Sequence, residues 1–325
     1  MGSTGMPEIK HDVFPYLKEY KDGTIERLVG TEIAPAGLDP ETGVVSEDII
    51  IIPDSGVSAR VYHPKHLHNH KNKLPLMIYF HGGAFCISSA SDPKYHHVLN
   101  LLVAEANIIA ISINYRNAPE YPLPTAYEDS WDALKWVASN MTNKDRSSLW
   151  DLIEFGKVFL VGDSAGANIS HHLAFRAKDS NLLGQLKFRG ILMIHPYFWG
   201  KEPIGCEVTD TFRKTMVDNW WLYVCPSDKG TDDPLINPLA DGSPSLTKLA
   251  CEKILVCVAE KDILRDRGVS YHESLKKSGW EGSAEILMTE GEDHVFHIFD
   301  PSTEKAQKFI RSLAAFIKEE KDPVA

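Results

Sequence analysis

The chain has 325 residues, of which 43% are hydrophobic and 24% charged, a composition typical of a globular protein with a large core. Its formal net charge of −11 disfavours a surface for nucleic acid or for a membrane, because either needs clustered lysine and arginine. The five cysteines are odd in number, which disfavours a disulfide framework, and show no metal-type paired spacing, which disfavours a zinc site. We therefore expect a cytoplasmic protein with a small-molecule partner.

Eight short runs of β-branched and other apolar residues predict strands. They lie at 48–52, 58–62, 76–80, 108–113, 157–162, 190–195, 253–259 and 284–289. Helix-period segments separate the later runs, which predicts a mostly parallel sheet with helices on both faces. The turn PDSG at 53–56 joins the first two runs and predicts an antiparallel hairpin at the sheet edge.

Two later segments have clear helical periodicity. The first, 125–141, has an apolar face that comprises Ala126, Trp131, Leu134, Val137 and Ala138. The second is the C-terminal segment 301–320, for which Asp300 is the expected N-cap and Pro301 the expected first helical residue.

No internal repeat or low-complexity linker divides the chain, so we expect one domain over residues 1–325. The stretch HLHNHKN at 66–72 is interpreted as a solvated loop, because no carboxylate or cysteine joins its three histidines to make a metal site. Residues 1–45 and the aromatic-rich segment 198–240 lie outside the predicted sheet. We expect both to form a cap over a pocket, with plain packing of a helix as the alternative.

The stretch VGDSAGANIS at 161–170 places Ser164 between Gly162 and Gly166, after a predicted strand and before a predicted helix. G-x-S-x-G in that context predicts a nucleophile elbow, a strained turn that lifts the serine hydroxyl above the sheet. The glycines suit such a turn because a side chain at either position would collide where strand and helix pass closely.

A serine nucleophile needs a base, and in this arrangement an acid and then a histidine follow it along the chain. Asp262 and His294 each come just after a predicted strand, so we expect Asp262 to orient His294 and His294 to accept the serine proton. Asp266 is a rival for the acid and His297 a rival for the base.

Acyl transfer also needs hydrogen-bond donors for the developing oxyanion. The stretch HGGAF at 81–85 follows an apolar strand, and its glycines let the backbone approach a substrate carbonyl. The predicted donors are the backbone N–H groups of Gly82, Gly83 and Ala165. His81 is expected to brace this turn by hydrogen bonding.

These motifs, together with NYRNAPEYPLPTAYED at 114–129, DDPLINP at 232–238 and GEDHVFH at 291–297, resemble the plant carboxylesterases of the hormone-sensitive-lipase branch of the α/β-hydrolase superfamily. The resemblance covers about residues 10–318. It implies an α/β-hydrolase fold with a helical cap, the triad and oxyanion hole given above, and no cofactor. It also implies that Arg116 and Glu120 tie loops together. One departure is Ala84, where many members have a third glycine.

The predicted function is therefore hydrolysis of small, fairly apolar carboxylic esters through an acyl-enzyme, by a monomer or homodimer. The alternative is a lyase or cyclase similar to the 2-hydroxyisoflavanone dehydratases or the tabersonine-synthase-like enzymes, which share most of this pattern. A hormone receptor of the gibberellin type is disfavoured because this chain keeps His294. The tentative pocket residues are Ala84, Phe85, Trp199, Trp220, Trp221 and Tyr223.

Overall fold

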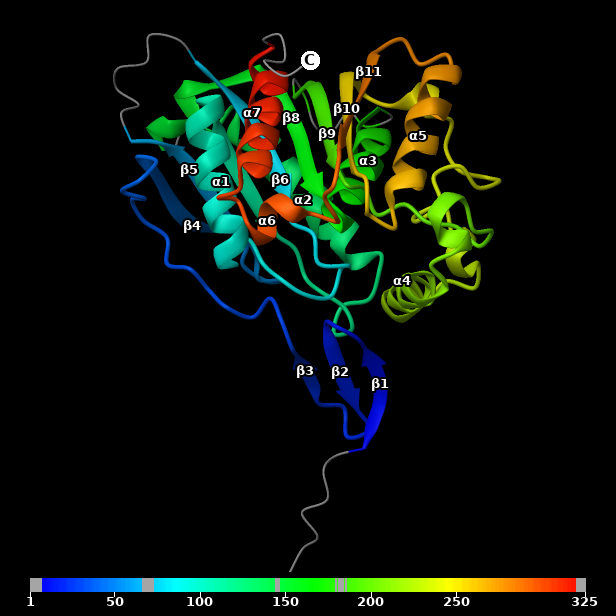
Figure 1. Cartoon of the computed structure of the whole chain (residues 1–325). Helices are drawn as coiled ribbons and strands as arrows, with labels where there is room; N and C mark the ends of the chain where they lie inside the picture. The colour runs from blue at the N-terminus through cyan, green and yellow to red at the C-terminus, as the bar shows by residue number, and fades with distance from the viewer. Residues whose placement is uncertain are drawn as a thin grey trace, which may run out of the picture.

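An eight-stranded sheet forms the centre of the molecule (Figure 1). The computed structural model describes residues 8–65, 73–143, 147–178, 180, 184 and 186–319, so the histidine-rich stretch at 66–72 lies outside the described residues. The strand order is β11-β10-β9-β8-β6-β7-β5-β4. The bounds are β4 (Val44–Ile52), β5 (Val57–Pro64), β6 (Leu74–Phe80), β7 (Ile109–Asn114), β8 (Ile153–Asp163), β9 (Phe188–Ile194), β10 (Cys251–Ala259) and β11 (Ser283–Thr289).

All eight predicted strands are confirmed, and so is the mostly parallel order. The six strands β6 to β11 pair in parallel with their neighbours in the sheet, whereas β5 pairs antiparallel with both β4 and β7. The hairpin of β4 and β5 therefore occupies one edge of the sheet, as predicted. β11 forms the opposite edge.

Helices cover both faces of the sheet and bury two separate apolar cores. One face carries α1 (Pro93–Ala106), α6 (Phe296–Phe299) and α7 (Glu304–Lys318); the other carries α2 (Thr125–Asn140), α3 (Ala165–Lys178) and α5 (Arg265–Lys277). Successive side chains of β6 point to opposite faces of the sheet, which separates the two cores. Met77 belongs to the core beneath α1 and α7, and Ile78 belongs to the core beneath α2 and α3. Short 3-10 helices occur at Ser148–Leu152, Gly205–Val208, Gly230–Asp232 and Leu246–Lys248.

The start of the C-terminal helix differs from the prediction. Thr303 is the N-cap of α7, and its hydroxyl accepts the Ala306 N–H at 3.1 Å. Asp300 instead accepts the N–H and hydroxyl of Ser302, and Pro301 lies in the turn before the helix. The prediction of Asp300 as N-cap was wrong because Thr303 satisfies the free N–H groups of the first turn from a closer position.

The segment at the N-terminus forms a second, three-stranded antiparallel sheet that the sequence analysis did not predict. It comprises β1 (Ile9–Val13), β2 (Leu17–Tyr20) and β3 (Ile25–Arg27). Figure 1 shows this sheet beside α4 (Thr211–Val224), the helix that the 198–240 segment contributes. The strands are only three to five residues long and rich in charged residues, so they carry a weak period-two signal.

Candidate active site

Ser164 lies at the sharp turn between β8 and α3, with a left-handed backbone φ of +51°. A Cβ atom added to Gly162 would overlap the backbone of Gly166, and one added to Gly166 would overlap the carbonyl oxygen of Phe80. Both glycines are therefore required for the close approach of strand and helix. The turn leaves the Ser164 side chain 7% exposed, on the wall of a cavity at the carboxyl edge of the sheet.

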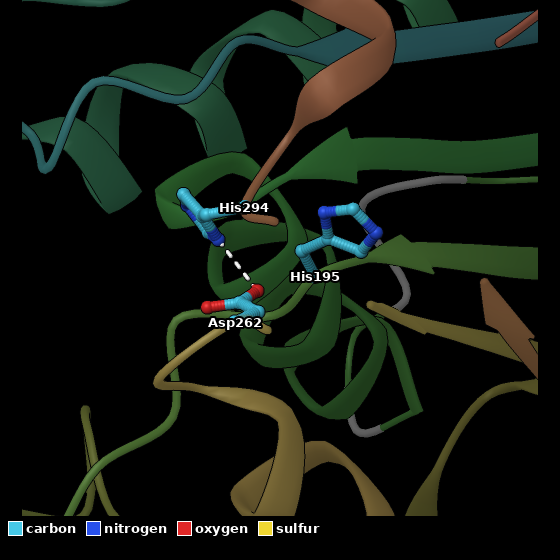
Figure 2. A group of neighbouring side chains, drawn as sticks. All are labelled: His195, Asp262 and His294. Carbon is cyan, nitrogen blue, oxygen red and sulfur yellow. Dashed lines mark hydrogen bonds and ion pairs between the residues drawn. The ribbon is translucent and has the colours of Figure 1, made fainter. Parts of the chain in front are cut away.

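His294 and Asp262 form a short hydrogen-bonded pair beside this turn (Figure 2). The distance from His294 Nδ1 to Asp262 Oδ2 is 2.7 Å, and the other carboxylate oxygen of Asp262 accepts the Leu264 N–H at 2.9 Å. The two residues follow β10 and β11, which are parallel neighbours, so their loops emerge together. The His294 side chain lines the same cavity as Ser164.

The electrostatics of the pair favour an ionised acid and a basic imidazole. Burial opposes the charge on Asp262, but the imidazole of His294 and its hydrogen bond outweigh burial and lower the pKa of the carboxyl. Burial also opposes protonation of His294, and here the charge of Asp262 outweighs it and raises the pKa of the imidazole. The hydrogen bond at Nδ1 leaves Nε2 as the nitrogen that can accept a proton.

Asp266 and His297, the alternatives for the acid and the base, bind other parts of the molecule. Asp266 accepts the Cys206 N–H at 2.7 Å and pairs with Arg265, so it joins α5 to the segment after β9. His297 is fully buried in the core beneath α7, 4.8 Å from the Phe309 ring between centroids.

A second histidine, which the sequence analysis treated only as the last residue of a strand, supports the His294 loop. His195 is buried beside the pair (Figure 2). Its Nδ1 accepts the Val295 N–H at 2.7 Å. Val295 directly follows His294 and has a left-handed φ of +45°. Burial lowers the pKa of His195 to about 3, so the ring stays neutral and its Nδ1 stays a hydrogen-bond acceptor.

The glycine loop after β6 has a different donor pattern from the one predicted. The Gly82 N–H contacts Asp163 Oδ1 at 3.0 Å and the Tyr95 hydroxyl at 2.9 Å. Because these internal partners occupy it, the prediction that Gly82 donates to the oxyanion was wrong. Gly83 and Ala84 both line the cavity, and neither donates its N–H to another residue within the described ranges.

Asp163 holds this loop against the elbow. Its carboxylate accepts the hydroxyls of Tyr79 at 2.7 Å and Tyr95 at 2.8 Å in addition to the Gly82 N–H. Burial raises the pKa of Asp163 to about 6 although the three hydrogen bonds favour its charged form. On the other side of the loop, His81 stacks on Tyr115 with centroids 4.3 Å apart, and its Nδ1 lies 2.7 Å from the Gly82 carbonyl oxygen, in agreement with a bracing role.

The cavity above Ser164 has a volume of about 500 Å³ and a mostly apolar wall. Of the tentative pocket residues, Ala84 and Trp220 line it. The other four are not on its wall: Phe85, Trp199 and Trp221 are fully buried in the core, and the Tyr223 hydroxyl binds Glu19 at 3.1 Å. The prediction for these four was wrong, because aromatic content does not distinguish the side of a cap helix that faces a cavity from the side that packs on the core.

Comparison with known proteins shows the family of this chain. Residues 77–298 match the model of a family described by its α/β-hydrolase fold. The chain belongs to the α/β-hydrolase family. Among curated relatives of this hydrolase, probable carboxylesterase 2 of Arabidopsis thaliana is 57% identical over 96% of this chain and 97% of its own length. A 2-hydroxyisoflavanone dehydratase of Glycyrrhiza echinata is 45% identical over 97% and 98%. A solved esterase of Pyrobaculum calidifontis has a TM-score of 0.70 and 30% identity over 84% of this chain and 85% of its own.

Within the described ranges of this α/β-hydrolase, one group of side chains has the spacing of a metal site, namely His195, Asp262 and His294. Two of the ring nitrogens already have hydrogen-bond partners, since His294 Nδ1 binds Asp262 and His195 Nδ1 binds the Val295 N–H, whereas His195 Nε2 has none among the described residues. The two hydrogen bonds account for the close spacing of the group. No helix in the same ranges combines the length and apolar character needed to cross a bilayer.

Proposed function

We propose that this α/β-hydrolase is a serine carboxylesterase that acts on small, fairly apolar esters through an acyl-enzyme. The observation that carries the proposal is the joint placement of Ser164 and His294 on one cavity wall, with Asp262 bonded to the far side of the imidazole. Relatives named as carboxylesterases, similar over nearly their whole length, support it.

In the first step, Ser164 Oγ attacks the ester carbonyl carbon while His294 Nε2 accepts the hydroxyl proton. Asp262 stabilises the imidazolium that forms. Collapse of the tetrahedral intermediate breaks the ester C–O bond, and the alcohol leaves with the proton from His294. Water then repeats the sequence on the acyl-enzyme, which releases the carboxylic acid and regenerates Ser164.

The oxyanion would be held by the N–H groups of Gly83, Ala84 and Ala165. Ala165 is the first residue of α3, so its N–H has no partner within the helix. Ala84 and Phe85 have left-handed φ angles of +49° and +63°, and Gly83 has φ of +104°. L-residues adopt this left-handed conformation at a cost, and functional loops often keep it.

The test is pre-steady-state hydrolysis of p-nitrophenyl acetate by wild type and Ser164→Ala. We expect a burst of p-nitrophenol with wild type and a loss of several powers of ten in kcat with the variant. Ser170→Ala is the matched control, because Ser170 is buried in α3, the helix that directly follows Ser164, and its hydroxyl binds the Gly166 carbonyl oxygen. A loss of only a few-fold in Ser164→Ala would contradict an acyl-enzyme.

A second candidate is an elimination or cyclisation with His294 as base and no acylation of Ser164. The observation that favours it is the similarity to two proteins named 2-hydroxyisoflavanone dehydratase. Products read by mass separate the two functions: hydrolysis adds one water and cleaves the substrate, whereas elimination removes one water. Elimination that persists in Ser164→Ala and disappears in His294→Ala would favour the second candidate.

A further inference from the structure

Three tyrosines line the cavity with Ser164, and they differ in what their hydroxyls bind. The Tyr95 hydroxyl donates to Asp163 at 2.8 Å, and the Tyr197 hydroxyl donates to the Val217 carbonyl oxygen at 3.3 Å. The Tyr16 hydroxyl has no hydrogen-bond partner in the part of the chain that the structure describes. A tyrosine hydroxyl in an enclosed site usually finds a partner, so Tyr16 is the one of the three that is available to a ligand.

The Tyr16 ring is held in place. It packs against the Trp220 ring of α4, with centroids 4.8 Å apart and an interplanar angle of 44°. Trp220 is itself fixed, because its Nε1 donates to the Phe14 carbonyl oxygen at 2.8 Å. The Tyr16 backbone bonds to Val13 and Leu28, both at 2.8 Å. A donor held this way loses little further conformational entropy when a ligand binds.

The turn that carries Tyr16 is also tied to the oxyanion loop. Arg27, at the end of β3, donates to the Cys86 carbonyl oxygen at 2.8 Å and to the Ala118 carbonyl oxygen at 3.0 Å. It also forms a bidentate pair with Glu120 at 2.6 and 2.8 Å. Cys86 lies two residues past Ala84, so the N-terminal sheet and the proposed oxyanion donors are held in one unit. The Tyr16 hydroxyl therefore has a defined position relative to the reacting carbonyl.

The character of the remaining wall limits what Tyr16 can bind. The side chains around the cavity are mainly aliphatic and aromatic, including Val29, Ile87, Ile263, Leu264, Ile298 and Phe299. Burial raises the pKa of the Tyr16 phenol, so the hydroxyl stays protonated and acts as a donor. Ser88 and the charged residues Lys94, Arg213 and Asp293 also line the cavity, so Tyr16 is the neutral aromatic donor of a wall that is apolar over most of its area. Such a wall suits an uncharged ring that carries an acceptor oxygen.

We propose that Tyr16 is a specificity-determining residue that donates a hydrogen bond to an ether, hydroxyl or carbonyl oxygen on a ring-bearing ester, at a position separate from the scissile carbonyl. The proposal rests on the proposed esterase function and names the substrate class of that same site. It assigns the N-terminal sheet a direct role in recognition.

The test compares matched esters whose rings differ by one acceptor atom. The acyl pair is p-nitrophenyl cyclohexanecarboxylate and p-nitrophenyl oxane-4-carboxylate; the alcohol pair is cyclohexyl acetate and oxan-4-yl acetate. The measured quantity is the ratio of kcat/KM for the oxane ester to kcat/KM for the cyclohexane ester, corrected for the ratio of their uncatalysed hydrolysis rates. For at least one pair, we expect this ratio to exceed one in wild type. Tyr16→Phe should lower it by a factor of about three to ten. Tyr223→Phe is the matched control, because this cap tyrosine binds Glu19 and lies off the cavity wall.

Equal effects of Tyr16→Phe on both members of both pairs would overturn the proposal, and so would the same loss of preference in Tyr223→Phe. Those outcomes leave the esterase proposal standing, since p-nitrophenyl acetate would still be hydrolysed. Failure of wild type to hydrolyse any ester would overturn both proposals together.

Discussion

The carboxyl edge of the sheet and the layer formed by β1–β3 and α4, here called the cap, are built by different means. At the sheet edge, Ser164, Asp262 and His294 follow β8, β10 and β11 within five residues of the strand ends, and the parallel pairing brings their loops together. In the cap, Tyr16 and Trp220 come from segments about 200 residues apart and meet through individual side-chain contacts. Under the two proposals, the chemistry belongs to the sheet edge and substrate selection to the layer beside it, so we expect their variants to affect different kinetic constants.

The largest expected effect is at the sheet edge. Asp262→Asn should keep the fold but lower kcat by roughly 10⁴, because the amide favours the wrong imidazole tautomer. Asp266→Asn is the control, since its carboxylate binds Cys206 and Arg265 away from the cavity, and it should cost less than about tenfold. Steady-state kinetics with circular dichroism on both variants would check this, and the reverse order of damage would refute Asp262 as the acid.

The dependence of kcat/KM on pH should reveal the pKa of His294 at the sheet edge. Protonation at low pH blocks the Nε2 lone pair of His294, so kcat/KM should fall as pH decreases through the histidine pKa. Asp262 raises that pKa above the ordinary value of about 6.5, so the rate at pH 5 should be more than about 30-fold below its plateau. A stability-checked profile from pH 5 to 9 gives the midpoint, and a midpoint below 6 would show that Asp262 does not stabilise the imidazolium.

A smaller effect should come from the support behind the triad. His195→Leu removes the acceptor for the Val295 N–H, so we expect kcat to fall about tenfold and the acid-limb pKa to decrease, with KM nearly unchanged. His195→Asn should recover part of kcat, since an amide oxygen can accept that N–H and asparagine tolerates the φ of +46°.

His297→Leu is the matched control for this support. His297 is another buried imidazole, with its ring centroid 6.0 Å from that of His195. Its two ring nitrogens have no hydrogen-bond partner among the described residues. We expect kcat within about threefold of wild type. An equal loss in His297→Leu would mean that the His195 effect reflects packing of the cluster.

The smallest expected effect lies in the cap. Arg27→Met should raise KM for ring-bearing esters about three- to tenfold and change kcat less than about twofold, because it loosens the sheet that carries Tyr16. Glu120→Gln should have a weaker effect, since Glu120 is half-exposed and Arg27 keeps its two carbonyl partners. A fall in kcat that exceeds the rise in KM would show that the cap also positions the triad.

Much of the sheet and the acid–base pair could be predicted because their signals are local. Each core strand is a continuous apolar run, and each candidate site residue follows a strand within five residues. Ser164 also carries its own glycine pattern. Closeness to the preceding strand end favoured Asp262 and His294 over Asp266 and His297, which fit the same order along the chain.

The oxyanion loop and the cap show where local signals fail. The pair Gly82–Gly83 marks a close backbone approach. The sequence does not show that the Gly82 N–H already has partners, which are the Asp163 carboxylate 81 residues away and the Tyr95 hydroxyl. Trp220 and Trp221 are adjacent and chemically identical, but one lines the cavity and the other is fully buried. His195 is missed for the same reason, since its partner Val295 is 100 residues further along the chain.

The amino-acid sequence by itself determined the mostly parallel sheet and the sharp turn at Ser164, and it named the candidate acid and base, because periodicity, glycine geometry and strand ends act over a few residues. The tertiary structure decided which N–H groups of the glycine loop already have partners, how the His294 loop is supported and which side chains line the cavity. Those features depend on which hydrogen-bonding groups are already satisfied and which face of a side chain is covered, and such contacts form between segments whose separation along the chain carries no local signal.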